Sequence, residues 1–311
     1  MNKYLPEGML ISSFQNHEYT SSQKGLERAL EKQVILEAPA VLCDHDFNLH
    51  VALGGRVKGI IPREEAEYSK NEETKDIAIL TRVGKPVCFT VSGFARDAHG
   101  EVTARLSRRA AQKECMENYV MTLEAGDVVP ARVTHLESFG AFVDIGCGIV
   151  SLLSIDAISV SRISHPSQRL AVGDRISTVI KSIDERGRIY VSSRELFGSW
   201  EENASCFGEG QTVKGIVRSV EDYGIFVELK PNLAGLAEYK SDVAVGQTAA
   251  VYIKSIIPEK MKIKLIIIDA QDAPLYNEPL EYFVNTEEVT HIDRWTYSPP
   301  TSKRVIESVF G

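Results

Sequence analysis

The chain has 311 residues and a formal net charge of −8 at pH 7, and this length predicts two to four domains. No apolar run reaches the ~18 residues that a membrane span needs, and residues 1–7 lack the charged-then-apolar pattern of an export signal. Five scattered cysteines with no C-x-x-C pair fit a reducing cytoplasm better than disulfides or a zinc site. We therefore expect a cytoplasmic protein without metal or cofactor.

The acidic balance argues against nucleic acid as a partner, because phosphate binding favours basic surfaces. The charge is unevenly distributed, however. Residues 126–196 hold 8 basic and 8 acidic side chains, whereas residues 271–311 hold 3 basic and 7 acidic ones. A neutral module can still bind a single strand if base stacking supplies about 1–3 kcal/mol per base. The charge lowers the expectation of nucleic-acid binding without excluding it.

An aromatic–glycine–aromatic pattern occurs three times along the chain. Its clearest copy is at residues 138–146, and altered copies lie at 47–54 and 223–229. The first aromatic residues of successive copies are 92 and 84 positions apart, as the numbers 47, 139 and 223 give. The sequence therefore predicts one module of roughly that size used three times.

Before and inside the first module, the pattern is less regular. Residues 1–32 read as a lead-in, with a short helix at 24–32 that Ser21 or Ser22 would cap. The module then opens on a strand that we expect to be interrupted at Pro39. Good helix formers at 108–123 predict a linker helix before the second module.

The middle module has the clearest plan of the three. Its alternating apolar runs predict five strands, with a helical turn between the third and the fourth, and the third module repeats this plan with a shorter centre. This order is typical of a small Greek-key barrel of the OB type. The strands are expected at residues 128–133, 139–145, 149–153, 175–180 and 188–192.

The fold class is therefore mostly β, with three tandem five-stranded OB-type barrels joined by short helical linkers. An aromatic tail follows, which we expect to pack in extended form, with a helical turn or two at 302–310. Trp200 and Trp295 are expected to be packing residues of the linker and the tail. The predicted divisions are a lead-in at 1–32, a degenerate module at 33–112, a linker helix at 113–125, the best-preserved module at 126–196, a linker at 197–209, a shortened module at 210–270 and an acidic tail at 271–311.

Three motifs of the middle module together resemble the ribosomal S1 RNA-binding domain. They are Phe-Gly-Ala-Phe-Val-Asp at 139–144, Val-Gly-Asp at 172–174 and Gly-Arg-Ile-x-Val-Ser at 187–192. Over residues 33–270 the chain resembles a short, three-domain, Firmicutes-like member of the bacterial ribosomal protein S1 family. The resemblance implies S1-type barrels and a protein, not an enzyme, that binds single-stranded RNA.

The resemblance also implies five RNA-contacting positions in each module. In the middle module these are two aromatics, a position usually held by histidine, and an acid and an arginine in the last hairpin. They correspond to Phe139, Phe142, Ser154, Asp184 and Arg188. Because serine cannot stack on a base, nearby His165 is an alternative for the third position.

The other two modules match the five positions less well. The third keeps an aromatic pair and one cation, with an acid at the histidine position. The first keeps one clear aromatic residue and no hairpin cation, so it is better suited to docking on protein. The third module's residues are Tyr223, Phe226, Glu238, Pro258 and Lys262, and the first module's are Phe47, His50, Pro62, His99 and Thr103.

Two plainer interpretations of these residues stay open. Strict alternation along a strand would send Phe139 and Phe142 to opposite faces, which would make one of them a core residue unless the strand bends at Gly140. Asp184 and Arg188 could form an ordinary surface ion pair worth less than ~1 kcal/mol.

The implied function is low-specificity binding of messenger RNA at the small ribosomal subunit, by a monomer with no membrane contact. Small-subunit proteins would be contacted through the first module or the tail. One alternative is a free RNA chaperone or translational regulator, and another is a protein-interaction scaffold built from S1-type barrels. The sequence contains no G-x-S-x-G or phosphate-cradling G-x-x-x-x-G-K motif, so we expect no enzyme.

Overall fold

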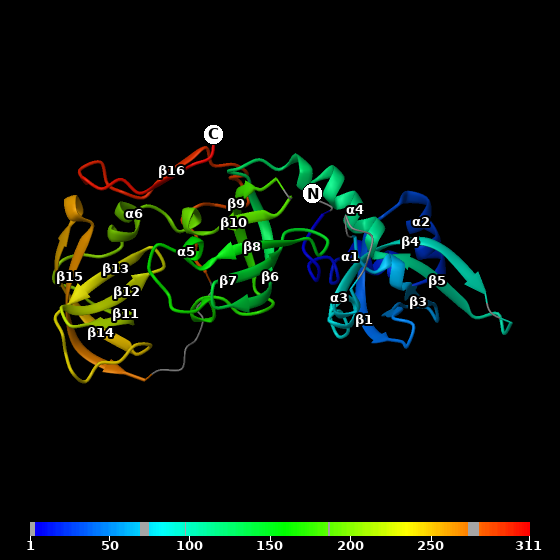
Figure 1. The fold of residues 1–311 in the computed structure, drawn as a ribbon, viewed down its shortest axis with the longest axis horizontal. Helices are drawn as coiled ribbons and strands as arrows, with labels where there is room; N and C mark the ends of the chain where they lie inside the picture. Colours follow the sequence, from blue (N-terminus) through cyan, green and yellow to red (C-terminus); the bar gives the residue numbers. More distant parts are fainter. Residues whose placement is uncertain (1–3, 69–74, 97, 186, 273–279) are drawn as a thin grey trace. The chain divides into compact units, whose positions relative to one another are not determined.

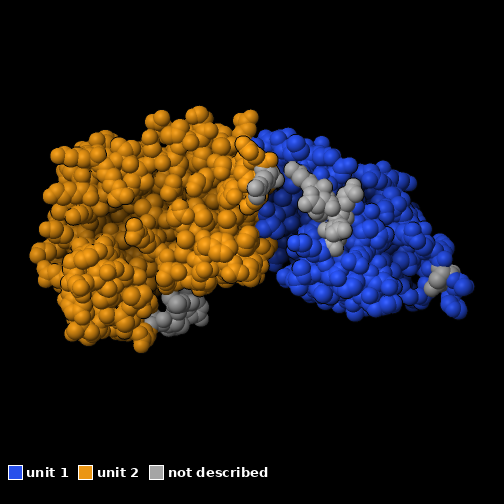
Figure 2. Space-filling view, in the orientation of Figure 1, with its two compact units in different colours: residues 1–123, 130–132, 144–150 blue, residues 124–129, 133–143, 151–311 orange. Residues whose placement is uncertain are grey.

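The computed structural model describes residues 4–68, 75–96, 98–185, 187–272 and 280–311. The chain divides into two compact units, coloured separately in Figure 2. Unit 1 contains residues 1–123, 130–132 and 144–150, and unit 2 contains residues 124–129, 133–143 and 151–311. Within the described ranges, no helix is both long and apolar enough to cross a membrane.

Fifteen of the strands form three closed barrels of five strands each, which confirms the predicted fold class (Figure 1). In every barrel the third strand pairs in parallel with the fifth. The first barrel contains β1 (Leu36–Cys43), β2 (Leu49–Ala52), β3 (Lys58–Ile61), β4 (Pro86–Arg96) and β5 (Val102–Ser107). The second contains β6 (Val128–Glu137), β7 (Gly140–Asp144), β8 (Val150–Ser154), β9 (Arg175–Ile183) and β10 (Ile189–Ser192). The third contains β11 (Thr212–Glu221), β12 (Gly224–Lys230), β13 (Leu233–Ala237), β14 (Thr248–Ile257) and β15 (Lys262–Gln271).

Short helices precede and connect the barrels, as the sequence predicts. The lead-in helix α2 begins where the Ser22 hydroxyl accepts the Gly25 N–H at 3.1 Å, so Ser22 is the cap. The α-helices are α1 (Phe14–Thr20), α2 (Gln23–Lys32), α3 (Asp76–Leu80), α4 (Arg108–Asn118), α5 (Ile155–Ile158) and α6 (Trp200–Ala204).

Two local expectations are wrong. Strand β1 runs through Pro39 without interruption, because Pro39 lies opposite Pro86 in the pairing with β4 and neither ring needs to donate a hydrogen bond there. The end of the tail is extended rather than helical. Its residues Glu307–Val309 form β17, which pairs with β16 (Arg294–Thr296). The neighbouring β-branched residues Val305 and Ile306 favour extended backbone.

A buried charge cluster organises unit 1. The Glu7 carboxylate accepts hydrogen bonds from Arg108 Nε and Nη2 at 2.7 and 3.0 Å, and the Glu7 N–H donates to Asp144 at 2.6 Å. Burial alone would raise the pKa of Glu7, but the charge and hydrogen bonds of Arg108 lower it. Burial raises the pKa of Asp144 to about 7. The first residues of the described chain are thus fixed by an ion pair that water does not reach.

A second carboxylate fixes the same lead-in. Glu37 on β1 accepts the N–H groups of Gly8, Leu10 and Ile11, each at 3.0 Å. Burial, the largest influence, raises the pKa of Glu37 to about 8 despite these donors, and the charge of Glu7 adds to the rise.

This raised pKa predicts a pH dependence of stability. Because the folded chain keeps a proton on Glu37 that the unfolded chain releases near pH 4.3, the free energy of unfolding should fall as the pH rises from about 5 through about 8. Glu37→Gln should reduce this slope by up to about 1.4 kcal/mol per pH unit. Urea unfolding of unit 1 at a series of pH values measures this slope. The exposed Glu117→Gln variant serves as control. Equal slopes in Glu37→Gln and wild type would contradict the assignment.

In unit 2, one buried asparagine connects the second and third barrels. The Asn232 side chain accepts the Val160 N–H at 2.9 Å and donates to the carbonyls of Arg194 at 2.7 Å and Gly198 at 2.9 Å. Its own backbone carbonyl accepts the Tyr297 hydroxyl at 2.7 Å. Asn232 therefore joins the crossing segment of the second barrel, the linker, the third barrel and the tail.

A buried ion triad adds a second connection between these barrels. The Glu228 carboxylate on β12 pairs with Arg218 at 2.9 Å and with Arg169, from the second barrel's crossing segment, at 2.7 Å. All three side chains are buried, and the single carboxylate offsets only part of the positive charge of the two guanidinium groups.

The tail packs on unit 2 through its aromatic residues. The Tyr282 hydroxyl accepts the Ser177 N–H of β9 at 3.0 Å. Trp295 and Tyr297 join the hydrophobic core of the third barrel together with Trp200, which confirms that both tryptophans are packing residues. Tyr276, which the sequence also assigns to this packing, lies outside the described residues.

Removal of the Asn232 side chain should destabilise unit 2 strongly. Asn232→Ala leaves one N–H and two carbonyl groups buried without their partner, at about 1–3 kcal/mol for each group, so we expect a loss of about 3 kcal/mol or more. Chemical denaturation measures the loss. The exposed Asn118→Ala serves as control and should change the free energy of unfolding by less than about 0.5 kcal/mol.

Candidate nucleic-acid interface

Two aromatic rings of the second barrel meet on its surface. The Phe139 and Phe142 ring centroids are 6.0 Å apart and their planes are inclined at 88°, an edge-to-face contact. Phe139 is 53% exposed and Phe142 is half-buried, whereas Ala141 and Val143 between and beyond them are fully buried in the core. Neither phenylalanine is therefore a core residue.

The backbone at Gly140 explains how both rings reach one face. Strand β7 begins at Gly140, so Phe139 precedes the strand. Its side chain therefore need not follow the alternation of side chains between the two faces of β7. A Cβ at Gly140 would lie 2.4 Å from the Leu153 carbonyl and 2.9 Å from the Ser154 Cα. Glycine is needed here for close approach of β8, rather than for an unusual backbone angle.

The remaining predicted residues of the middle barrel fall into two groups. Ser154 ends β8 directly beside Gly140, and thus lies near the aromatic pair. Asp184 and Arg188 form the turn between β9 and β10, two strands away from β7 in the barrel order. The Arg188 N–H donates to Asp184 Oδ1 at 2.8 Å, and their charged groups lie 3.7 Å apart on the surface. This pair orders the hairpin and leaves most of the Arg188 side chain exposed.

His135 is a further aromatic residue, one that the sequence did not point to. It lies on β6, and its ring stacks on Phe142 with centroids 6.3 Å apart and planes inclined at 23°. The His135 side chain is 61% exposed and its Nε2 lies 2.7 Å from Glu137. His165, the alternative that the sequence suggested, instead accepts the Ser167 N–H at 3.1 Å. The ring that joins Phe139 and Phe142 thus comes from His135 on β6 and not from the position of Ser154.

The third barrel repeats the aromatic pair. Tyr223 and Phe226 have centroids 6.2 Å apart and planes inclined at 85°, and Tyr223 is 71% exposed. Gly224 takes the place of Gly140. Its φ is 148°, and a Cβ at this position would lie only 2.5 Å from the Ala237 carbonyl. Lys262 begins β15 and is exposed, and Glu238 is exposed after β13.

The described part of the first barrel contains no open aromatic pair. The Arg63 guanidinium lies 5.1 Å from the centroid of the Phe47 ring, which packs partly against the core, and His50 is bonded to Asp44 at 3.1 Å. Pro62 precedes a short helical turn, Thr103 lies on β5, and His99 lies in the turn before it.

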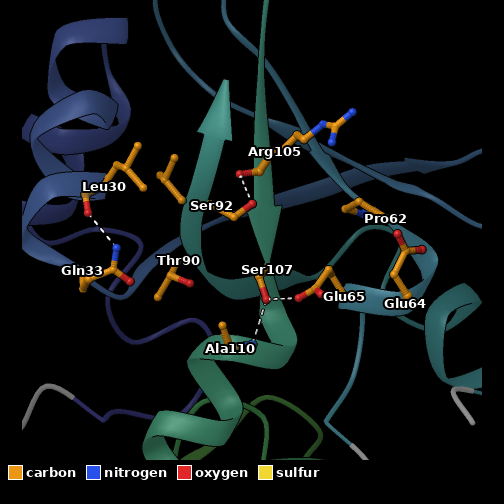
Figure 3. Close-up of a pocket in the computed structure, with 11 residues that line it drawn as sticks. Leu30, Gln33, Pro62, Glu64, Glu65, Thr90, Ser92, Arg105, Ser107 and Ala110 are labelled. Carbon is orange, nitrogen blue, oxygen red and sulfur yellow. Dashed lines mark hydrogen bonds between the residues drawn. The ribbon is translucent and has the colours of Figure 1, made fainter. Parts of the chain in front are cut away.

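A pocket of about 470 Å³ opens elsewhere on the first barrel (Figure 3). Side chains from α2, β4, β5 and the start of α4 line it, and the Ser107 hydroxyl donates to Glu65 there. The lining contains two carboxylates, Glu64 and Glu65, and one guanidinium, Arg105, so it is not suited to phosphate. Among all described residues, no cluster of three or more His, Cys, Asp or Glu side chains could hold a metal ion.

The family comparison identifies the middle barrel. Residues 122–194 match the model described as the S1 RNA binding domain. The chain resembles ribosomal protein bS1. The small ribosomal subunit protein bS1 of Leuconostoc lactis is 39% identical over 116 residues, which cover 37% of this chain and 27% of that protein. The bS1 of Staphylococcus aureus strain MRSA252 is 28% identical over 315 residues, which cover 97% of this chain and 74% of that protein.

Coverage of the bS1 relatives is often partial. The match to bS1 of Pseudomonas aeruginosa is 28% identical and covers 75% of this chain but 43% of that protein. The chain thus spans less than half the length of the Leuconostoc and Pseudomonas relatives that it matches.

The stacked histidine gives a test of this bS1-like surface. His135→Ala should weaken the binding of single-stranded RNA by about 1 kcal/mol, because a stacking ring is lost without disturbing the core. Fluorescence anisotropy with a labelled oligouridylate measures the affinity. His165→Ala is the matched control and should leave the affinity unchanged. The opposite ranking of the two variants would assign the third ring to His165.

Proposed function

We propose that this chain binds single-stranded RNA with little sequence preference, as a bS1-like translation factor that holds messenger RNA near the small ribosomal subunit in the cytoplasm. The observation that carries the proposal is the exposed edge-to-face aromatic pair, which occurs at the same place in the second and third barrels. Flat rings stack on bases of any identity, so two such surfaces suit a ligand of variable sequence.

The middle barrel is the main binding module in this proposal. Among the described residues, it alone combines the aromatic pair with a stacked histidine and an exposed arginine, Arg188. The third barrel extends the RNA path, since its pair is also exposed, but its histidine position is held by Glu238. The protein acts as a monomer and needs no catalytic group or cofactor.

The first barrel serves protein contacts in this proposal. Its Phe47 ring is half-buried with the Arg63 guanidinium over it, and its His50 side chain is 32% exposed against 61% for His135, so these rings offer less surface to a base. The acidic side chains of the tail would contribute to the same contacts, because its aromatic residues Tyr282, Trp295 and Tyr297 already pack within unit 2.

Titration of a labelled single-stranded RNA with Phe142→Ala tests the proposal. The variant should bind about 1–3 kcal/mol more weakly than wild type, because a base loses its stacking partner. Exposed Phe14→Ala, on α1, is the matched control. A wild-type Kd weaker than about 0.1 mM at low salt would favour a protein-interaction scaffold, because even non-specific nucleic-acid binding reaches that value.

Gradient sedimentation of cell extract then separates the two RNA-binding roles. Co-sedimentation with the small subunit supports the ribosomal role. A profile confined to the top fractions would favour a free RNA chaperone or translational regulator.

A further inference from the structure

The aromatic pair of the third barrel has acidic surroundings. Glu221 and Asp222 directly precede Tyr223, Glu238 follows β13, and all three carboxylates are exposed. Phosphates of an RNA that stacks on Tyr223 and Phe226 therefore need cations from another part of the barrel.

Strand register leads from this pair to such cations. Phe226 on β12 is paired with Leu236 on β13, Leu236 is paired with Lys264 on β15, and Lys264 is paired with Ser255 on β14. These paired residues therefore connect the Phe226 ring, across β13, with the exposed ammonium group of Lys264. Figure 1 shows the strands concerned on the third barrel.

The outer face of β14 and β15 combines lysines with an aromatic ring. Lys262 and Lys264 alternate on β15 with the buried Ile263 and Leu265, so both lysines point outward. Tyr252 on β14 is 37% exposed and is paired with Ile266 on β15, which is 43% exposed.

A bulge adds a third lysine to this face. The register of β14 and β15 shifts between Ile253 and Ser255, and Lys254 is the exposed residue at the shift. In the part of the chain that the structure describes, Lys254, Lys262 and Lys264 form no ion pair with a carboxylate.

The corresponding strand of the second barrel is covered. There the Tyr282 hydroxyl and the Thr286 hydroxyl of the tail are bonded to Ser177 on β9. On the third barrel, by contrast, Tyr252, Ile266 and Lys264 remain exposed. The two barrels thus differ in the availability of this face.

We propose that single-stranded RNA continues from Phe226 across Leu236 to a second contact surface on the third barrel, formed by Lys254, Lys264 and Tyr252. This proposal rests on the proposed function of the chain. The Tyr252 ring stacks on a base, and the two lysines contact phosphates on either side of it.

The dimensions suit a short stretch of RNA. From β12 to β14 the path crosses three strand spacings, about 14 Å in all. This length corresponds to roughly four nucleotides at the ~3.4 Å spacing of a stacked strand. Glu238 lies two residues after Leu236, so the path passes this carboxylate on β13 before it reaches the lysines of β14 and β15.

The test compares salt dependence in the full chain. The double variant Lys254→Ala/Lys264→Ala is titrated with an oligouridylate of about 24 nucleotides, long enough for two OB-type barrels, at several salt concentrations. Loss of two phosphate contacts should make the slope of log K against log salt less negative by about 1.4. The exposed pair Lys24→Ala/Lys32→Ala on α2 is the matched control and should keep the wild-type slope.

The stacking role of the Tyr252 ring is tested separately. Tyr252→Ala should weaken binding of the same RNA about 5- to 150-fold, the range that the loss of one stacked base gives, whereas Tyr252→Phe should bind like wild type. Circular dichroism and thermal unfolding verify that both variants fold.

The outcomes separate this proposal from the proposed function. If wild type binds RNA and Phe142→Ala weakens it, while the lysine and Tyr252 variants behave as wild type, the second surface is refuted and the function stands. Absence of RNA binding by wild type refutes both.

Discussion

The relation between the second and third barrels depends on the buried side chain of Asn232. Its amide accepts one hydrogen bond from the crossing segment and donates two to the linker, so no apolar residue can replace it without leaving those groups unpaired. The buried triad of Arg169, Glu228 and Arg218 and the packed tail act on the same pair of barrels. Together these contacts make unit 2 one body whose two aromatic surfaces have a fixed relation.

The aromatic surfaces themselves depend on close approach of backbones. In both barrels a glycine at the start of the second strand lets the third strand come near enough to exclude any Cβ. The preceding aromatic residue is thereby placed outside the strand, where it can meet the ring three positions later. Similar ring geometry in the two barrels, 88° and 85°, follows from this shared constraint rather than from identical residues.

The sequence predicts the barrels well because alternation and turn residues are local signals. It also predicts the exposed ring at Phe139, through the repeat. His135 was not predictable in this way, since its contact with Phe142 arises only once β6 and β7 lie together in the barrel. Asn232 carries no local signal either, because its partners come from three distant segments. Pro39 was misjudged because its effect on a strand depends on what lies opposite, here another proline.

Because the second and third barrels form one body, the affinities of their two proposed RNA sites combine. Once RNA is bound at one barrel, the second event becomes intramolecular, and its strength is set by an effective concentration instead of the concentration in solution. Such linkage raises avidity by about 10² to 10⁴ over either site alone when the geometry permits both. The buried Arg169–Glu228–Arg218 triad holds the two barrels together, so their relative position does not depend on a flexible linker. In the proposed RNA-binding role, two modest stacking surfaces can thus hold a strand that neither would retain alone.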